Sequence, residues 1–414
     1  MIKQIAWKVR IYPNKSQEVL VNKTLGSCRF IYNNMLAEHI EVYNQLKDSR
    51  RELYEYKYKT EKDYKEEFEW LKEVDSIALQ QSRRDLVSAY SNFFKSLSGK
   101  HKGKSGFPKF HKKGQKESYR TQNVNNNIKI DLELKKLKLP VVGWLHYHDQ
   151  RVPEGKIMNA TISKTKTGKY FVSILLQKEI EAPKQFDLES ALDNGLFIKG
   201  LDMSLERFYV DENDDSPNYI RLFRKYEDRI AYLQRKVSKK KKCSSNRRKA
   251  QLRVNKIYEK IANSRKDFVE KLSYKLINEN DVIVTETLSL KGMSQVLNLG
   301  KSVMDLGYSQ FIKRLQDKAI DNGKLVIQAD KWFASSKTCS NCGYVYKDLK
   351  LSDKEWDCPI CGSHHLRDMN AGQNLKEYGL SVILNSGREP TSVPLEMSAL
   401  AESKKEEFQS LFGG

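Results

Sequence analysis

The sequence of 414 residues lacks long apolar runs, and this absence excludes one large class of protein. No stretch of about 18 consecutive apolar residues occurs, so no membrane-spanning helix is expected. The first residues, MIKQIAWKVRIYPNK, are charged where a secretory signal peptide would be apolar. We therefore expect a cytosolic protein with no membrane partner.

Cysteine is also scarce, and two common kinds of catalytic motif are absent. Six cysteines in a chain of this length are too few for a disulfide-rich secreted scaffold. No glycine-rich loop of the Walker type leads into a Lys-Ser or Lys-Thr pair, so a P-loop nucleotide site is excluded. No pattern indicates a serine or cysteine nucleophile. Any catalysis must therefore depend on other groups.

What the chain has in excess is positive charge. Its 74 Lys and Arg residues outnumber its 53 Asp and Glu residues, which gives a formal net charge of +21. Such a charge opposes compaction unless a polyanion shares the surface, so nucleic acid is the expected partner. The length suggests two or three domains, and the 21 Tyr, 16 Phe and 5 Trp argue against a disordered basic tail.

The excess charge lies in two strips. Residues 99–120 carry a net charge of +7 and residues 221–271 a net charge of +14, which together equal the excess of the whole chain. Such strips can follow a phosphate backbone, although a solvated linker is the alternative for residues 99–120. The candidate contacts are Lys109 in the first strip and Lys239, Lys240, Lys241, Lys242, Arg247 and Arg248 in the second.

Four of the cysteines form the most specific local motif. Cys339 and Cys342 are separated by fifteen residues from Cys358 and Cys361. Two such CxxC knuckles bind one Zn²⁺ through four thiolates, and a closed shell of this kind is structural rather than catalytic. A glycine follows each pair, where the tight turn requires a residue that tolerates positive φ. Disulfides or redox-active pairs are the alternative.

Hydrophobic periodicity divides the first half of the chain into strands and helices. Residues 3–12 alternate as a strand that stops at the turn signal Pro13-Asn14. From residue 17 to about 97, apolar residues recur at three- and four-residue steps, which predicts a helical bundle. Further strands, which with the first suffice for a small β-barrel, are predicted at 127–132, 137–139, 156–163 and 170–177.

The second half of the chain mixes strands and helices. Residues 197–201 and 207–210 are predicted as short strands, and residues 220–237 and 252–276 as amphipathic helices. The basic segment KKKKCSSNRRK joins the two helices into a hairpin. Residues after about 377 have little core pattern, and we assign no role to them.

Three acidic residues stand out by their positions. Asp202 and Glu286 each end a short apolar strand, and Asp368 lies at the expected start of a helix after the cysteine motif. Carboxylates in a fixed cleft are costly to shield from water unless a cation shares the site. Three of them can hold two Mg²⁺ ions about 4 Å apart for phosphodiester hydrolysis. Helix caps and surface acids are the alternative interpretation.

Seven short motifs follow one another in a distinctive order. They are Tyr12-Pro13-Asn14 with Gln17, Arg29-Phe30-Ile31-Tyr32-Asn33, Phe107-Pro108-Lys109-Phe110, Gly200-Leu201-Asp202, Glu286-Thr287-Leu288-Ser289-Leu290-Lys291-Gly292-Met293, Ser335-Ser336-Lys337-Thr338-Cys339-Ser340-Asn341-Cys342-Gly343 and Arg367-Asp368-Met369-Asn370-Ala371. In combination the sequence resembles TnpB, the family of transposon-encoded, RNA-guided DNA nucleases related to compact type V CRISPR effectors. The resemblance covers roughly residues 1–380.

The resemblance implies a multidomain α+β fold. Its first part would be a wedge-like β-barrel interrupted by a helical recognition bundle, and its second part an RNase H-like (RuvC) α/β nuclease domain with an inserted zinc module. The implied boundaries are 1–15 and 118–182 for the barrel, 16–117 for the helical domain with its basic linker, 190–335 and 363–380 for the nuclease domain with its basic hairpin at 220–278, 336–362 for the zinc module, and 381–414 for a disordered tail.

The resemblance also implies an activity. Asp202, Glu286 and Asp368 would be the catalytic triad of an endonuclease that uses two Mg²⁺ ions to cut double-stranded DNA beside a short target-adjacent motif. Besides Mg²⁺, the implied cofactors are a structural Zn²⁺ and a guide RNA from the transposon end. One monomer per guide would act on target DNA in a bacterial-type cytosol, associated with the nucleoid.

The resemblance also implies that residues 75–94 and 119–123 recognise the target-adjacent motif in DNA. Ser76, Gln80 and Thr121 are the candidates, since Gln can pair bidentately with adenine in the major groove. Ordinary exposed helix residues are the alternative.

Three positions depart from the family pattern. Ser204 and Ala334 replace residues that are usually Gly and Pro, and Leu366 removes an acid often found two residues before the third carboxylate. We expect turnover to differ from that of typical members.

Three other functions remain open. A guided DNA-binding repressor that has lost cleavage is disfavoured because all three acids are present. A DNA transposase with an RNase H-like acidic triad is disfavoured by the cysteine module and the long N-terminal half. An RNA-binding zinc protein would explain the charge but not the acids.

Overall fold

The computed structural model describes residues 1–100, 105–115, 117–183, 185–295, 300–350 and 352–386. The chain divides into two compact units, Met1–Ala182 and Pro183–Gly414, and each has a hydrophobic core of its own. None of the described helices is long and apolar enough to cross a membrane.

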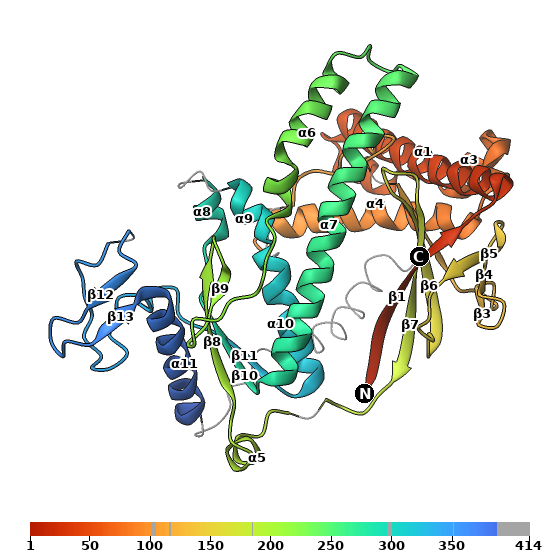
Figure 1. Ribbon diagram of the computed structural model, residues 1–414. Helices are drawn as coiled ribbons and strands as arrows, with labels where there is room; N and C mark the ends of the chain where they lie inside the picture. The colour runs from red at the N-terminus through yellow and green to blue at the C-terminus, as the bar shows by residue number, and fades with distance from the viewer. Residues whose placement is uncertain (101–104, 116, 184, 296–299, 351, 387–414) are drawn as a thin grey trace. The chain divides into compact units, whose positions relative to one another are not determined.

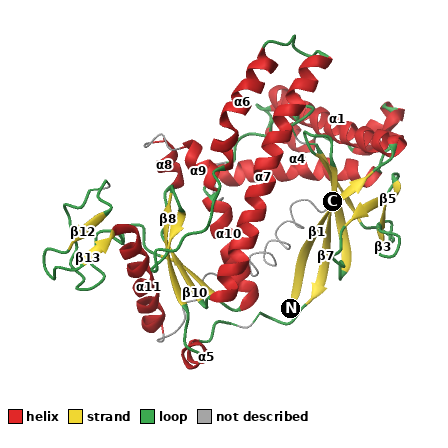
Figure 2. Ribbon diagram, in the orientation of Figure 1, coloured by secondary structure: helices red, strands yellow, loops and turns green. Residues whose placement is uncertain are grey.

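The first unit is built on an antiparallel sheet of seven strands (Figures 1 and 2). Strand β1 (Ile2–Tyr12) pairs with β5 (Gly143–His148) on one side and with β7 (Tyr170–Glu179) on the other. Alternation along β1 places Trp7 and Val9 in the core. The other strands are β2 (Ser118–Gln122), β3 (Lys129–Asp131), β4 (Lys136–Leu139) and β6 (Lys156–Lys164).

This sheet is open, so the closed barrel expected from the sequence is wrong. Its order, β2-β6-β7-β1-β5-β4-β3, ends in two edges, and no pairing joins β2 to β3 among the described residues. Strands β3 and β4 have only three and four residues, which offer few hydrogen bonds for closure. Helices complete the core instead, because the apolar residues of the helical segment belong to the same cluster as those of the sheet. The result is a half-barrel backed by helices.

Helices make up most of the chain from Lys15 to Leu97, and the predicted helical bundle is confirmed. Helix α1 (Lys15–Leu46) begins at a capping box, in which Asn14 accepts a hydrogen bond from the backbone N–H of Gln17 and the Gln17 side chain accepts one from that of Asn14. Helix α4 (Ser76–Leu97) packs against α1. The shorter elements are α2 (Arg50–Glu55), α3 (Glu61–Glu67) and the 3-10 helix η1 (Glu69–Glu73).

The second unit contains a four-stranded sheet in the order β11-β10-β8-β9. Strands β8 (Ile198–Ser204), β10 (Val282–Thr285) and β11 (Leu325–Gln328) are parallel, and β9 (Phe208–Val210) is antiparallel to β8. All four residues of β10 are buried, as is typical of a sheet covered on both faces.

Helices supply those two covers (Figure 2). Helices α7 (Ser245–Glu279) and α10 (Tyr308–Asn322) share a core with Ile283, whereas α11 (Arg367–Ser386) shares a core with Val284. The predicted helical hairpin is confirmed as α6 followed by α7. The other described elements are α5 (Leu188–Asp193), α6 (Leu222–Ser238), α8 (Leu290–Gln295), α9 (Gly300–Leu306), β12 (Glu355–Asp357) and β13 (His364–Leu366).

The tail expected from residue 381 is wrong for its first six residues, because α11 continues to Ser386. Ile383 is 3% exposed and packs into the core that α11 forms with the sheet, which explains why the helix extends this far. Residues 387–414 of the expected tail lie outside the described residues.

Glycines set the distance between α11 and the sheet. A Cβ atom on Gly200 of β8 would lie 2.0 Å from the carbonyl oxygen of Gly372, and one on Gly379 would lie 2.3 Å from Cγ2 of Val284. These approaches leave no room for a side chain, so only glycine permits this helix-on-sheet contact.

We predict that Gly200→Ala lowers the free energy of unfolding by at least about 1–3 kcal/mol, the usual cost of overpacking. Urea unfolding of the full chain measures this change. Gly106→Ala is the matched control, because nothing lies within 4 Å of a Cβ atom at that position. Equal unfolding midpoints for the wild type and Gly200→Ala would contradict the packing described.

Candidate active site and metal centre

Three carboxylates from three separate elements come together in the second unit. Asp202 lies within β8, Glu286 directly follows β10, and Asp368 lies in the first turn of α11. Because β8 and β10 are parallel neighbours paired through Leu201 and Thr285, the residues that follow this pair are adjacent. The prediction that Asp202 ends its strand is wrong by two residues, since β8 continues beyond it.

Burial and the charges of neighbouring carboxylates disfavour the charged forms of Asp202 and Glu286. Asp202 is 8% exposed, and its burial, followed by the charges of Glu286 and Asp368, raises its pKa well above the ordinary value. Burial also raises the pKa of Glu286. Without a cation, burial therefore favours the protonated forms of these two groups.

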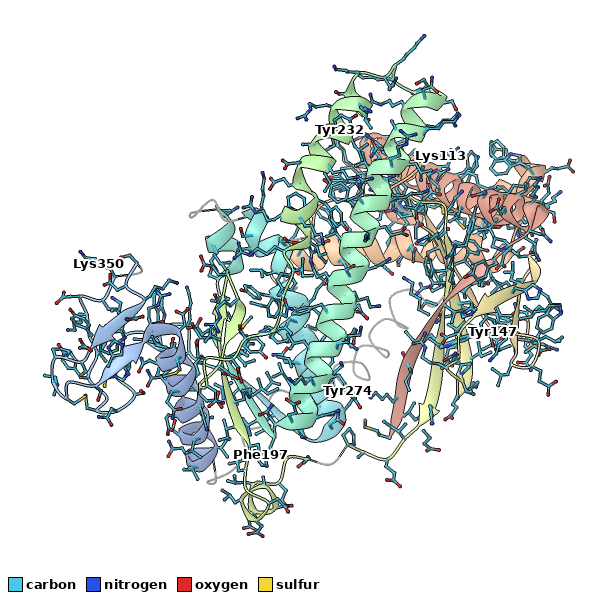
Figure 3. All side chains as sticks on the ribbon, viewed as in Figure 1. Lys113, Tyr147, Phe197, Tyr232, Tyr274 and Lys350 are labelled. Atoms are coloured by element: carbon cyan, nitrogen blue, oxygen red, sulfur yellow. The ribbon has the colours of Figure 1, made fainter. Side chains whose placement is uncertain are left out.

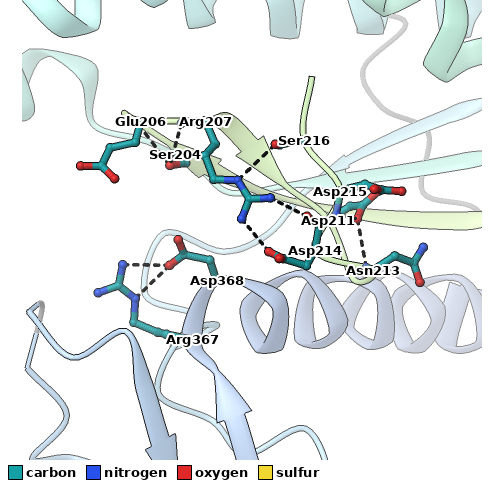
Figure 4. Close-up of polar contacts among 10 residues, drawn as sticks. All are labelled: Ser204, Glu206, Arg207, Asp211, Asn213, Asp214, Asp215, Ser216, Arg367 and Asp368. Atoms are coloured by element: carbon teal, nitrogen blue, oxygen red, sulfur yellow. Dashed lines mark hydrogen bonds and ion pairs between the residues drawn. The ribbon is translucent and has the colours of Figure 1, made fainter. Parts of the chain in front are cut away.

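Two neighbouring side chains orient the other carboxylates. Ser335 Oγ donates a hydrogen bond of 2.7 Å to Glu286 Oε1. Arg367 Nε and Nη2 donate to Asp368 Oδ1 at 3.0 and 2.8 Å (Figure 4). The Arg367 charge also opposes the increase in the pKa values of Asp202 and Glu286. Sequence reasoning missed the role of Ser335 and treated Arg367 only as part of a motif.

Two buried asparagines on α11 hold the segment that leads into the cysteine motif. Asn370 Nδ2 donates to the carbonyl of Thr338 at 2.7 Å, and its Oδ1 accepts from the N–H of Ser340 at 3.0 Å. Asn374 Nδ2 donates to the carbonyls of Ser335 and Thr338 at 2.8 and 2.6 Å. The helix that carries the third carboxylate is thereby joined to the segment that orients the second.

A serine and a buried tyrosine hold the turn after the first carboxylate. Ser204 Oγ accepts hydrogen bonds from the N–H groups of Glu206 and Arg207 at 3.3 and 3.2 Å (Figure 4). Tyr308 Oη donates to the carbonyls of Ser204 and Phe208. Phe208 has a φ of +74°, which is strained for a bulky residue and persists because its ring is fully buried. Ser204, a departure from the family pattern, therefore serves as a turn cap.

The four cysteines form a compact cluster whose Sγ atoms all lie within 4.8 Å of one another. The Sγ atoms of Cys339 and Cys361 are 3.6 Å apart, and those of Cys342 and Cys358 are 3.5 Å apart. Tetrahedral Zn²⁺ with Zn–S bonds of about 2.3 Å requires sulfurs about 3.8 Å apart, so the donor set fits zinc. All four thiols are free, so the disulfide alternative is wrong. The glycines after the pairs have φ of +76° and +69°, as predicted.

The cysteines of the cluster differ in how readily they form the thiolate, which is the metal-binding form. Hydrogen bonding with Ser363 lowers the pKa of Cys361 to about 5, whereas burial and hydrogen bonds with the other three sulfurs raise the pKa of Cys342 to about 12. His365 is 6% exposed, its Nε2 lies 3.0 Å from Cys339 Sγ, and its ring lies against Trp356. Burial lowers the pKa of His365, so a neutral ring protonated at Nε2 can donate to the thiolate.

The candidate phosphate contacts of the second strip lie at the tip of the hairpin of α6 and α7, beyond the labelled Tyr232 of α6 (Figure 3). The side chains of residues 239–242 and of Arg248 are exposed, and no described acidic side chain pairs with the four lysines. Arg247 differs, because its Nη1 donates to the carbonyls of Val237 and Lys240 at 2.8 and 3.0 Å. Its guanidinium closes the hairpin turn, so Arg247 has a structural role in addition to its predicted role as a phosphate contact.

The candidate contacts of the first unit also divide into two groups. Ser76, Gln80 and Lys109 are exposed, and Ser76 Oγ accepts a hydrogen bond from Lys65 Nζ at 2.6 Å. Thr121 is 0% exposed, so its hydroxyl does not reach the surface, and its prediction as a DNA contact is wrong for this structure. The side-chain alternation of β2 turns Thr121 into the core.

Three family models match parts of the chain. The family described as "Probable transposase" matches residues 190–297, which include the first two carboxylates. "Cas12f1-like, TNB domain" matches residues 308–375, which include the cysteine cluster and the third carboxylate. "Helix-turn-helix domain" matches residues 1–48, where the structure has strand β1 and helix α1.

Similar proteins extend over nearly the whole chain. A Streptomyces pristinaespiralis protein, provisionally named an RNA-guided DNA endonuclease, is 31% identical over 389 residues, which cover 92% of this chain and 91% of that protein. An Escherichia coli K12 protein, provisionally named the RNA-guided DNA endonuclease InsQ, is 28% identical over 418 residues, covering 95% and 98%. A solved Cas12f1–sgRNA–target DNA complex covers 91% of this chain and 98% of that one, with 13% identity and a TM-score of 0.49, too low to carry an argument.

The raised pKa of Asp202 predicts how stability depends on pH. The unfolded carboxyl titrates near pH 4, so in magnesium-free buffer the folded protein loses stability as pH rises above this value and through the raised pKa. Asp202→Asn removes the buried charge and should raise Tm near pH 8, by roughly 2–4 °C for each kcal/mol of repulsion removed. Thermal melts between about pH 4 and about pH 8 measure the effect.

Asp193→Asn is the matched control, since Asp193 is exposed on α5. Its Tm should follow that of the wild type at every pH. If the Tm of Asp202→Asn depends on pH in the same way as the Tm of the wild type, the carboxylates do not repel one another in the folded chain.

Proposed function

The chain belongs to the TnpB family of transposon-encoded RNA-guided DNA endonucleases, and on this premise we propose that Asp202, Glu286 and Asp368 form its catalytic site. The observation that supports the proposal is the convergence of these carboxylates from β8, β10 and α11, where the charges of Glu286 and Asp368 act on Asp202. In a soluble fold such an arrangement costs free energy, and carboxylate oxygens are the ligands that Mg²⁺ prefers.

The donor chemistry therefore fits Mg²⁺ held by the three carboxylates. When bound, Mg²⁺ supplies positive charge to a phosphodiester and lowers the pKa of a coordinated water. Ser335 fixes the orientation of Glu286 through its hydrogen bond, and Arg367 fixes that of Asp368. The side chain of Arg367 is 13% exposed and pairs with Asp368, so its charge would partly offset that of the carboxylates.

The cysteine cluster is proposed as a structural zinc site. A four-thiolate shell has no open position for a substrate, so it stabilises the fold rather than the reaction. Zinc binding would affect the active site through the hydrogen bonds of Asn370 and Asn374, which join α11 to the segment before Cys339. Zinc binding would in this way favour one position of Asp368.

The expected domain roles and partners remain proposals. The half-barrel and helices of the first unit would recognise a short motif in the target duplex, with Ser76 and Gln80 as the exposed candidates. The basic hairpin of α6 and α7 would hold a guide RNA from the transposon end, or its duplex with the target. One monomer per guide, acting in the nucleoid-associated cytosol, is the proposed assembly.

The experiment that tests the catalytic site offers a target plasmid with a randomised flank and Mg²⁺ to the protein purified with its native flanking DNA co-transcribed. We predict that Asp202→Ala reduces cleavage by at least about 10³-fold, because groups that act as a unit cannot substitute for one another. RNA sequencing of the purified complex should identify one defined guide.

Asp193→Ala provides the control for loss of an aspartate and should cleave like the wild type. Linear product that persists with Asp202→Ala would overturn the triad. Guide binding without cleavage by the wild type would instead support the inactive repressor, and joined transposon ends would support a transposase.

A second prediction concerns the lysines at 239–242. Because no described acidic side chain pairs with them, replacing all four by glutamine should weaken RNA binding and reduce the slope of log K against log salt by up to about three to four. Filter binding across a salt series measures both effects. The cleaved sequence should not change.

Lys271→Gln with Lys275→Gln is the matched control, because these exposed lysines pair with Asp267 and Glu279 on their own helix. This variant should retain the salt slope. A changed target preference in the 239–242 variant would contradict a purely electrostatic role.

A further inference from the structure

A hollow in the first unit lies outside the active site described above. It has a volume of about 570 Å³ and is formed by one face of α1 and by η1. This size falls within the range of pockets that hold small ligands. Three of its residues, Arg29, Phe30 and Asn33, belong to a motif that the proposed cleavage chemistry does not use.

One wall of the hollow is aromatic. Trp70 is 42% exposed although it is the bulkiest residue of η1. Phe30 contacts its ring edge-on, with centroids 5.0 Å apart, and Phe68 contacts it at 6.3 Å. These contacts fix the indole ring while leaving part of it uncovered, which is the arrangement required for stacking on a planar ligand.

A glycine keeps the hollow open. Gly26 lies in the middle of α1, where glycine destabilises a helix relative to alanine. A Cβ atom there would meet nothing closer than Arg29 Nη2, at 4.0 Å, so packing within the protein does not require glycine. Because glycine has no side chain, position 26 instead leaves space in the hollow.

Polar groups line the other side. Asn34 Nδ2 donates to the carbonyl of Phe30 at 2.9 Å, and no described residue donates to its Oδ1, which is left to accept a hydrogen bond. Arg29 makes a long contact of 3.5 Å with Glu117, and Lys23 pairs with Glu73 at an exposed position. Because the Lys23–Glu73 pair is about half exposed, it contributes little, and a phosphate can replace the Glu73 carboxylate at small cost.

The hollow is also connected to the basic strip. Asn33 Nδ2 donates to the carbonyl of His111 at 3.0 Å, and Asn33 Oδ1 accepts from the N–H of His111 at 2.8 Å. The His111 ring stacks on Tyr32, with centroids 3.8 Å apart. A strand that follows the cations of residues 105–115 would therefore pass beside the hollow.

We infer that this hollow binds one unpaired nucleotide, with the base stacked on Trp70, its edge hydrogen-bonded to Asn34, and its phosphate near Arg29 and Lys23. An aromatic face, an amide and cations together match a nucleotide, whereas a purely apolar ligand would leave the polar groups unpaired. The inference depends on the proposed function only in that a single-stranded RNA or DNA is present. The hollow provides recognition of an extruded base by the first unit, separate from cleavage.

The test measures binding of the full chain to labelled eight-nucleotide single strands of RNA and of DNA by fluorescence anisotropy without Mg²⁺. Trp70→Ala should weaken binding by about 5- to 150-fold, the loss of one stacked base. Gly26→Leu, which fills the hollow with a good helix former, should weaken binding similarly without lowering Tm. A blunt DNA duplex, which offers no unpaired base, should bind each variant equally.

Trp144→Ala is the matched control, because Trp144 is 44% exposed on β5 and outside the hollow. It should bind like the wild type. If Trp70→Ala loses affinity only for the RNA strand or only for the DNA strand, the result identifies the source of the nucleotide. Loss of affinity for both strands means that the hollow accepts a nucleotide from either one. Unchanged binding by Gly26→Leu would overturn the inference. Equal losses of affinity with Trp70→Ala and with Trp144→Ala would also overturn the inference. Since no cleavage is measured, these results do not depend on the catalytic triad.

Discussion

The repulsion among three carboxylates in a largely buried site is the constraint on which the second unit depends. Asp202 and Glu286 are adjacent because β8 and β10 are parallel neighbours, and burial raises the pKa of both groups. A fold does not keep such an arrangement for stability, because buried like charges oppose folding. A bound cation would reverse the sign of this contribution, so the same residues that destabilise the free protein would stabilise its metal-bound form.

The rest of the second unit holds the third carboxylate near the other two. Close glycine contacts let α11 lie directly on the sheet, and Asn370 and Asn374 connect it to the segment that carries Ser335. That segment continues into the cysteine cluster, so the proposed zinc site and the proposed active site would share one hydrogen-bonded support. This arrangement explains why a metal module with no open position belongs in a nuclease.

Local sequence signals predicted part of this structure well. The turn signal Pro13-Asn14 at the end of the first strand, the periodicity of the hairpin helices and the cysteine spacing are local, and the structure agrees with all three. Strands β2 and β5 were not predicted. The open edges of the sheet, the burial of Thr121 and the turn-closing role of Arg247 depend on long-range packing or on backbone partners, which no local pattern reveals. Ser335 was missed because its partner is 49 residues away in sequence.

The most direct test of the account is the number of protons released when Mg²⁺ binds to the nucleic-acid-free protein. Isothermal titration in two buffers with different ionisation enthalpies measures this number. Because burial raises the pKa of Asp202 and of Glu286, the account predicts proton release below neutral pH that declines as pH rises, and a smaller release in Asp202→Asn. Mg²⁺ binding without proton release, or unchanged binding in Asp202→Asn, would contradict it.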